Sequence, residues 1–211
     1  MNIQAFPSGT FVTNAYVVSC IETGESAIFD PAPGSAEKII TYCQEKNLLP
    51  NKIFITHSHW DHIADTAVLK DHFNAEVFVH PLDAPNLRKP GSDGLPLMFP
   101  IKGVEPDKLL NEGDTVTIGK LHFQIIHTPG HCRGSICFYS SEENVVFVGD
   151  TLFKGSIGNL SLPTSHAEDM WPSLAKLSKL PPETKVYSGH GPSTTIGKES
   201  WLANAKTIFG Y

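Results

Sequence analysis

Short apolar segments rich in β-branched residues recur along this chain, and their recurrence restricts the fold more than any other feature. Each segment has the length of a strand and is bounded by Gly, Pro, Asp or Asn, as strands usually are. The predicted strands are Thr10–Ser19, Ser26–Phe29, Lys52–Ile55, Glu76–Val79, Thr115–Ile118, Leu121–Ile126, Ser135–Tyr139, Val145–Val148 and Lys185–Tyr187. Two blocks of strands with helices between them predict an α/β (or α+β) arrangement in which helices cover the sheets.

Four segments between or after these strands have helical spacing. We expect Ser35 to cap the first helix and the residues after Asp61 to form the second. Asp169 is a candidate cap for the third, and Pro172 is then tolerable only in the first turn. Residues 201–209 carry apolar side chains at helical spacing and predict a final helix.

Length and composition indicate a folded protein. The chain has 211 residues, of which 40% are hydrophobic and 18% charged, so we expect one domain over residues 1–211. No segment approaches the roughly 18 uncharged apolar residues of a membrane helix. The first residues lack the pattern of a secretion signal, so a cytoplasmic location is expected.

The charge balance is acidic, with 22 Asp and Glu against 16 Lys and Arg. A nucleic-acid-binding surface needs clustered basic residues, so we expect no nucleic-acid partner. The four cysteines are Cys20, Cys43, Cys132 and Cys137, and none of their spacings is CxxC. We interpret them as reduced thiols rather than as a disulfide framework.

Histidine and aspartate cluster directly after four of the predicted strands. The segment KIFIT leads into residues 57–62, LHFQII into 127–131, NVVFVG into Asp150, and KVYSG into His190. Residues just beyond strand ends are where sheet proteins commonly place ligands and catalytic groups. If these strands are neighbours, the clusters converge at one rim.

The residue types in these clusters are suitable ligands for zinc, iron and other divalent transition metals. Seven groups exceed the needs of one tetrahedral metal and suffice for two metals that share a carboxylate. The expected division is His57, His59 and His131 for one metal, Asp61, His62 and His190 for the other, and Asp150 between them. Two metals held about 3.5–4 Å apart would bridge a water and lower its pKa toward about 7.

The remaining histidines have no partner spacing that would indicate a ligand. We interpret His72, His80, His122 and His166 as structural or exposed. For His127, at the end of a strand, an orienting hydrogen bond is favoured over metal binding.

Residues 84–108 interrupt the pattern with a segment rich in Pro and Gly that carries Leu95, Leu97, Met98 and Phe99. A loop of this length inside a domain is usually functional or disordered. Two interpretations remain open: a lid over a site, or a surface excursion whose apolar tip packs on the body.

At these motifs the chain resembles the metallo-β-lactamase superfamily, and within it the short glyoxalase II-like (hydroxyacylglutathione hydrolase-like) enzymes. The motifs are THSHWDH (56–62), HTPGHCRGS (127–135), GDTLF (149–153) and SGHGP (188–192). The resemblance implies a four-layer αβ/βα sandwich with the metals at one edge of two sheets. It supports the seven ligand positions, and FDPAPG (29–34) implies that Asp30 lies near them.

The chain departs from glyoxalase II at three places. About twenty residues follow His190, with Lys198 and Lys206 as the only bases, so we expect no separate C-terminal glutathione-binding helical domain. Asn159 stands where short relatives often carry Arg, and Cys132 where Thr is usual. We interpret Cys132 as a tolerated small thiol.

The leading functional hypothesis is a dinuclear metal-dependent hydrolase of thioesters such as S-lactoylglutathione, with a metal-bridging hydroxide as nucleophile. Asp61 and Asp150 would orient the hydroxide as well as bind metal. Zinc is the first choice of metal, with iron or manganese as alternatives, and the expected partner is a small-molecule substrate rather than a membrane.

Three alternatives stay open. One is a mononuclear iron dioxygenase of glutathione persulfide that uses His57, His131 and Asp150. Another is a lactone or other ester hydrolase with the same chemistry. The third is a metal-binding module without catalysis. The sequence predicts no oligomeric state.

Overall fold

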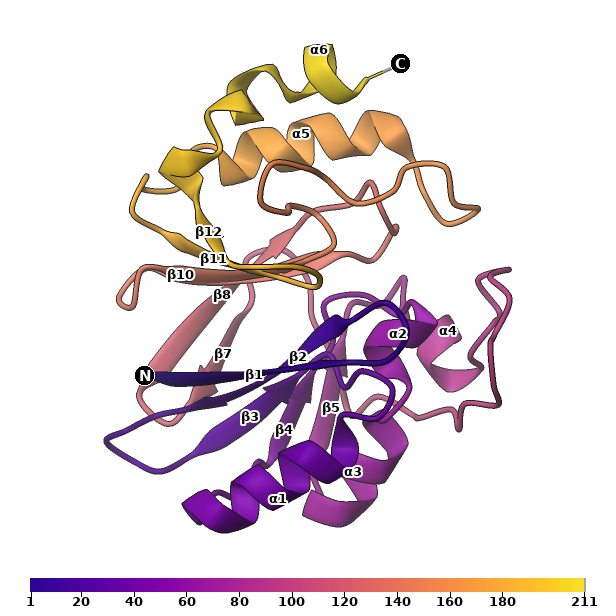
Figure 1. The fold of residues 1–211 in the computed structure, drawn as a ribbon, viewed down its shortest axis with the longest axis vertical. Helices are drawn as coiled ribbons and strands as arrows, with labels where there is room; N and C mark the ends of the chain where they lie inside the picture. Colours follow the sequence, from indigo (N-terminus) through magenta and orange to yellow (C-terminus); the bar gives the residue numbers. More distant parts are fainter. Residues whose placement is uncertain (211) are drawn as a thin grey trace.

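Two six-stranded sheets face each other in the computed structural model, which describes residues 1–210 (Figure 1). The first sheet contains, in spatial order, β1 (Asn2–Ser8), β2 (Thr13–Ser19), β3 (Ser26–Phe29), β4 (Lys52–Phe54), β5 (Glu76–Val79) and β6 (Lys108–Leu109). The second contains β12 (Thr194–Thr195), β11 (Lys185–Ser188), β10 (Val145–Gly149), β9 (Ile136–Ser140), β8 (Leu121–His127) and β7 (Thr115–Ile118). Strands β3 to β6 pair in parallel, as do β10 and β11.

Helices cover the outer face of each sheet. The first sheet carries α1 (Ala36–Lys46) and α3 (Thr66–Phe73), and the second carries α5 (Ala167–Leu177), against which α6 (Ala205–Phe209) packs (Figure 1). Two short helices, α2 (Trp60–Ile63) and α4 (Ala84–Arg88), follow β4 and β5. The order helix, sheet, sheet, helix confirms the expected four-layer αβ/βα sandwich.

Three apolar clusters fill the three spaces between these layers. Phenylalanines dominate the middle one, where Phe29 stacks on Phe147 at 4.3 Å between ring centroids and so joins the two sheets. The outer clusters pack Ile39 of α1 on the first sheet and Leu174 of α5 on the second. Within residues 1–210, no helix combines the length and the apolar character needed to cross a membrane.

Several strand predictions need correction. The segment predicted as Thr10–Ser19 begins only at Thr13, because Gly9 to Val12 form a turn in which Val12 has a φ of 55°. Strands β1, β6 and β12 were not predicted. β1 is a partly exposed edge strand that contains Pro7, and the other two have only two residues each, so none carries a strong apolar pattern.

Three helix predictions were also wrong in detail. Ser35 occupies the N-cap position of α1 as predicted, but its hydroxyl makes no capping bond, and Asp65 instead accepts the Ala36 N–H at 2.8 Å. Helix α5 begins at Ala167 rather than after Asp169, which places Pro172 in the second turn. Residues 201–209 divide into a 3₁₀ segment, Ser200–Asn204, and the short α6, because Asn204 leaves helical geometry with φ at −122°.

Candidate metal centre

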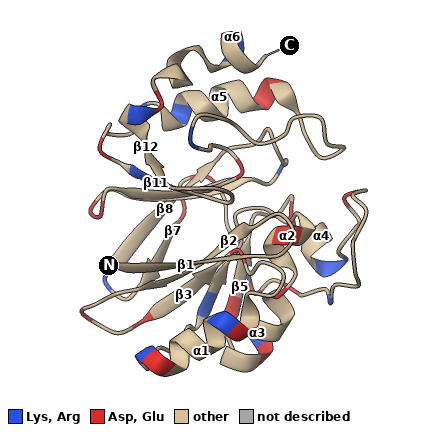
Figure 2. Cartoon of the chain, in the orientation of Figure 1, with Lys and Arg blue, Asp and Glu red and all other residues tan. Residues whose placement is uncertain are grey.

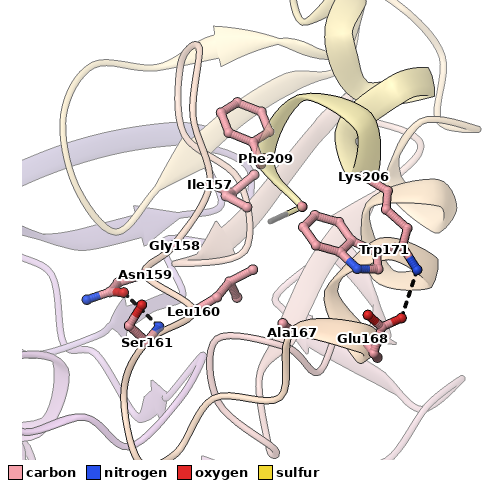
Figure 3. Close-up of a pocket in the computed structure, with 11 residues that line it drawn as sticks. Ile157, Gly158, Asn159, Leu160, Ser161, Ala167, Glu168, Trp171, Lys206 and Phe209 are labelled. Carbon is pink, nitrogen blue, oxygen red and sulfur yellow. Dashed lines mark hydrogen bonds and ion pairs between the residues drawn. The ribbon is translucent and has the colours of Figure 1, made fainter.

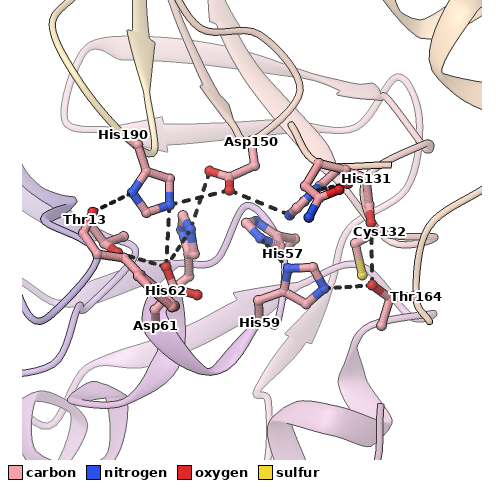
Figure 4. Close-up of polar contacts among 12 residues, drawn as sticks. Thr13, His57, His59, Asp61, His62, His131, Cys132, Asp150, Thr164 and His190 are labelled. Atoms are coloured by element: carbon pink, nitrogen blue, oxygen red, sulfur yellow. Dashed lines mark hydrogen bonds and ion pairs between the residues drawn. The ribbon is translucent and has the colours of Figure 1, made fainter. Parts of the chain in front are cut away.

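Four loops at one rim of the facing sheets bring the seven candidate ligands together (Figure 4). Residues 57–62 run from the end of β4 into α2, and His131 follows β8. Asp150 comes directly after β10, and His190 lies two residues after the end of β11. Each sheet therefore supplies part of the site, and six of the seven side chains are buried.

The first group consists of His57, His59 and His131. One ring nitrogen of each lies within 4.8 Å of the others. Nε2 of His57 and Nδ1 of His59 are 3.1 Å apart. Three converging imidazole nitrogens are a common arrangement at metal sites.

The second group consists of Asp61, His62 and His190, whose ligand atoms also lie within 4.8 Å of one another. Oδ2 of Asp61 is 3.3 Å from Nε2 of His190 and 3.5 Å from Nε2 of His62. The hydroxyl of Thr13 donates to the same oxygen at 2.7 Å and fixes the carboxylate.

Asp150 lies between the two groups. Its Oδ2 is 3.5 Å from Nε2 of His131, in the first group, and 3.3 Å from Nε2 of His190, in the second. Its Oδ1 is 3.3 Å from Nε2 of His62. One carboxylate thus faces both groups, as a ligand shared by two metals would.

Contacts on the outer side of the rings determine which nitrogens face inward as acceptors. The carbonyl of Asn159 accepts from Nδ1 of His131 at 2.9 Å, and the carbonyl of Phe11 accepts from Nδ1 of His190 at 3.0 Å. A carbonyl oxygen only accepts, so both Nδ1 atoms carry a proton, and each ring, in the neutral form that binds metal, would present the Nε2 lone pair to the centre.

The same logic applies to His57 and His59. The Thr56 hydroxyl donates to Asp30 at 2.7 Å and so accepts from Nδ1 of His57 at 3.2 Å. The Thr164 hydroxyl donates to the His131 carbonyl at 3.4 Å and accepts from Nε2 of His59 at 2.8 Å. The inner nitrogens of the two rings then both carry lone pairs, which face each other across 3.1 Å.

Asp30 holds His62 from behind, in the position that the motif resemblance implied. Its Oδ2 lies 3.0 Å from Nδ1 of His62, and its Oδ1 accepts the backbone N–H of Thr56 at 2.7 Å. Carboxylates in this position orient a metal-binding imidazole and raise its basicity.

In the metal-free chain, two histidines of the first group and His190 of the second group have pKa values shifted in opposite directions. Burial and then the neighbouring His131 lower the pKa of His59 to about 3, and burial lowers the pKa of His57 well below its usual value. For His190, burial is outweighed by the hydrogen bonds that its ring donates to Asp150 and Asp61, which raise its pKa to about 9. Burial would raise the pKa of Asp61, but His62 and His190 lower it to about 2. At neutral pH the site therefore holds ionised carboxylates and two imidazoles kept neutral.

Unsatisfied polar atoms provide a direct test of whether a cation fits. Ten buried side-chain N and O atoms among the described residues have no hydrogen-bond partner, and three of them are Nε2 of His62, Nε2 of His131 and Oδ1 of Asp150. Buried polar groups are almost always paired, and each exception needs an explanation. All three atoms belong to the seven candidate ligands, so the residues present fit divalent cations well.

Two glycines allow loops to approach the centre closely. A Cβ on Gly158 would lie 2.0 Å from the Asp150 carbonyl oxygen and 2.9 Å from Nδ1 of His131. A Cβ on Gly189 would lie 2.2 Å from Oδ1 of Asp150. Any side chain at either position would displace a candidate ligand.

The other histidines lie outside the centre. His127 stacks on His80 at 4.2 Å between ring centroids, and its Nε2 donates to the Arg133 carbonyl, so it orients none of the candidate ligands. His72, His122 and His166 are exposed.

The cysteines are all unpaired and buried. Cys132 follows His131 but points to Asp83, whose Oδ1 accepts from the thiol at 3.2 Å. Burial and the nearby Asp83 charge raise the pKa of this thiol, which makes it a poor nucleophile.

A cavity of about 360 Å³ opens beside the ligands and is lined by Leu95, Pro96 and Met98 from the loop after α4. A second cavity, of about 440 Å³, lies between residues 157–161 and helices α5 and α6, and none of the seven ligands lines it (Figure 3). The two cavities share only Asn159.

Over the helices and loops of the chain, Lys and Arg are interspersed with Asp and Glu (Figure 2).

Several contributors to the site gave no usable signal in the sequence. The Phe11 and Asn159 carbonyls act through the backbone, which every residue possesses. Thr13 and Thr164 lie far along the chain from their partners Asp61 and His59. Thr56, by contrast, stood inside a motif, as the first residue of THSHWDH.

Comparisons with known proteins agree on one family. The profile of the metallo-β-lactamase superfamily matches residues 8–190. A probable metallo-hydrolase of Bacillus subtilis is 35% identical over 93% of both chains. A hydroxyacylglutathione hydrolase of Haemophilus influenzae is 33% identical over 94% of this chain and 95% of its own.

Two solved structures are similar along nearly their whole length. The BLEG-1 B3 metallo-β-lactamase has a TM-score of 0.86 and 39% identity, covering 94% of this chain and 96% of its own. A protein crystallised in a di-iron-bound form has a TM-score of 0.81 and 36% identity, covering 93% and 96%.

Proposed function

This chain belongs to the metallo-β-lactamase superfamily, and from that premise we propose that it is a dinuclear metal-dependent hydrolase of thioesters. One observation carries the proposal: two groups of three ligand atoms lie side by side with Asp150 facing both. The hydroxyacylglutathione hydrolase of Haemophilus influenzae supports the choice of thioesters.

Two cations would be held by the seven side chains in the expected division. His57, His59 and His131 would bind one, Asp61, His62 and His190 the other, and Asp150 both. When bound, such cations supply an activated water as nucleophile and Lewis acidity toward a carbonyl oxygen. The relative crystallised with two irons supports iron as well as zinc.

The residues of the chain would orient the reaction. Asp61, fixed by Thr13, and Asp150 each place a carboxylate oxygen 3.3 Å from Nε2 of His190, where they would accept a hydrogen bond from the attacking water. The cavity of about 360 Å³ would hold the thioester beside them. Neither Ser nor Cys is needed as nucleophile, and the buried Cys132 is directed away, toward Asp83.

The test combines metal content with turnover on one purified sample. We expect two divalent metals per chain and hydrolysis of S-lactoylglutathione that is lost on chelation and restored by metal. About one iron per chain with oxygen uptake on glutathione persulfide would favour the dioxygenase. Hydrolysis of only lactones or β-lactams would replace the thioester assignment, and the β-lactam arm is included because of the B3 relative. Metal binding without turnover on any of these substrates would leave a non-catalytic module.

We further propose that residues 1–211 form one domain and that the partner is a small molecule rather than nucleic acid. The excess of Asp and Glu over Lys and Arg, 22 residues against 16, supports the exclusion of nucleic acid as a partner.

A further inference from the structure

Exposed apolar side chains gather at the mouth of the cavity beside the candidate metal centre. Phe11, Met98 and Phe99 are 55%, 60% and 41% exposed. Trp60 lies between two of them, with ring centroids 5.4 Å from Phe11 and 5.7 Å from Phe99. Single exposed apolar residues are ordinary on a protein surface, but a cluster beside a cavity marks a binding surface.

Phe11 stands on a rigid part of this mouth. Its carbonyl accepts from Nδ1 of His190, and the N–H of Asn14, just beyond it, donates to the Gly189 carbonyl at 2.7 Å. Val12 keeps a φ of 55°, which a β-branched residue adopts only when its surroundings impose it. The turn therefore fixes Phe11 relative to the ligand His190.

The wall of the cavity opposite Phe11 is formed by the loop after α4, and this loop can adapt to a ligand. Leu95, Pro96 and Met98 line the cavity. The loop is anchored before them, where Asp93 accepts the Leu95 N–H at 3.0 Å, and after them, where the Val104 N–H donates to the Leu87 carbonyl at 2.9 Å. From residue 96 to 103 no backbone group makes a hydrogen bond with another described residue. Such segments belong to the least stable parts of a fold.

The cavity offers no partner for a charged thiol carrier. None of the residues that line it is Lys or Arg, and its only charged side chains, apart from the histidines, are Asp61 and Asp150. Glutathione carries two carboxylates, which proteins usually bind with Arg or Lys. The walls thus match an apolar group better than an anionic one.

From these observations we propose that the substrate carries an apolar acyl group, which lies between Phe11, Trp60 and Met98, and that Phe11 and Met98 determine this specificity. The proposal rests on the thioesterase assignment above and names its substrate class. It predicts recognition of the acyl chain, with little contribution from a charged carrier.

The experiment varies the acyl group and the carrier independently. Acetyl, hexanoyl and lactoyl thioesters are each prepared on glutathione and on the uncharged N-acetylcysteamine. We expect kcat/KM to rise about tenfold or more from acetyl to hexanoyl on both carriers, because each buried methylene favours binding. The preference for hexanoyl should fall several-fold in Met98→Ser and Phe11→Ser. It should be unchanged in Leu49→Ser, a matched exposed apolar residue (82% exposed) that does not line this cavity.

A binding measurement separates this proposal from the thioesterase assignment. Uncleavable S-methyl and S-hexyl thioethers of N-acetylcysteamine are titrated calorimetrically into the metal-loaded protein and the three variants. Tighter binding of the hexyl compound that is lost in Met98→Ser supports the apolar site, even if no thioester is hydrolysed. Equal affinity for both compounds, or a preference for lactoylglutathione over the hexanoyl thioesters, would overturn it.

Discussion

Nδ1 of His62 lies 3.0 Å from Oδ2 of Asp30, and neither side chain is accessible to solvent. Both Asp30 oxygens accept bonds, since Oδ1 takes the Thr56 N–H and Oδ2 takes the Thr56 hydroxyl as well as the His62 ring. In Asp30→Asn, an NH₂ group would replace one of the two accepting oxygens. In either orientation of the amide, this NH₂ donor would then face another donor.

We therefore expect Asp30→Asn to weaken metal binding by about 10–100-fold. The backbone should tolerate the change, because residue 30 has a φ of 46° and Asn adopts this region readily. Competitive titration with a chelating dye measures the affinity, and Asp71→Asn at an exposed position is the control. Unchanged affinity would show that Asp30 does not position His62.

Substitutions of Asp150 and His59 test whether these side chains bind metal. Either Asp150→Ala or His59→Ala should lower turnover by about 100-fold or more, since each removes a proposed ligand. The circular dichroism spectrum should remain that of the wild type, because neither side chain belongs to the three apolar clusters. Purified variants with nearly normal turnover would disprove the ligand assignment.

Gly158 provides a test in which none of the proposed ligand residues is itself substituted. In Gly158→Ala the new methyl group would enter the space of the Asp150 carbonyl and the His131 ring, at 2.0 and 2.9 Å. We expect reduced metal content and activity. The matched variant is Gly155→Ala, where a Cβ meets nothing within 4 Å and the cost, about 1 kcal/mol, comes from its positive φ. Equal effects of the two substitutions would contradict the steric argument.

His80 should make the protein less stable in acid. Burial and then the stacked His127 lower its pKa from 6.5 to about 4, so the unfolded chain binds a proton that the folded chain excludes. The free energy of unfolding should therefore fall as the pH drops from 6.5 to about 4, by at most about 3 kcal/mol for this group. Urea unfolding of wild type and His80→Gln across this range isolates the contribution, because effects common to both cancel. A constant difference between the two proteins would refute it.

Local patterns in the sequence predict sheets covered by helices, whereas the four-layer order was implied by the resemblance of the motifs to a known family. Strand-length apolar runs are visible residue by residue, but the four polar clusters follow strands of two different sheets, so their meeting at one rim depends on how the sheets pack. The turn at Gly9–Val12 was mistaken for strand because its side chains are apolar while its backbone is not extended. The roles of Thr13, Thr164 and the Phe11 carbonyl depend on chain segments meeting across the fold, and no local pattern encodes that.

The position of the candidate centre across the two sheets has a consequence for the chain as a polymer. Residues 57–62 follow a strand of the first sheet, and residues 131, 150 and 190 follow strands of the second. Bound cations would tie these distant segments together much as a covalent cross-link does, but reversibly and only in the folded state. The gain in stability then grows with the logarithm of the free metal concentration, so metal supply would act on the lifetime of the folded chain as well as on catalysis.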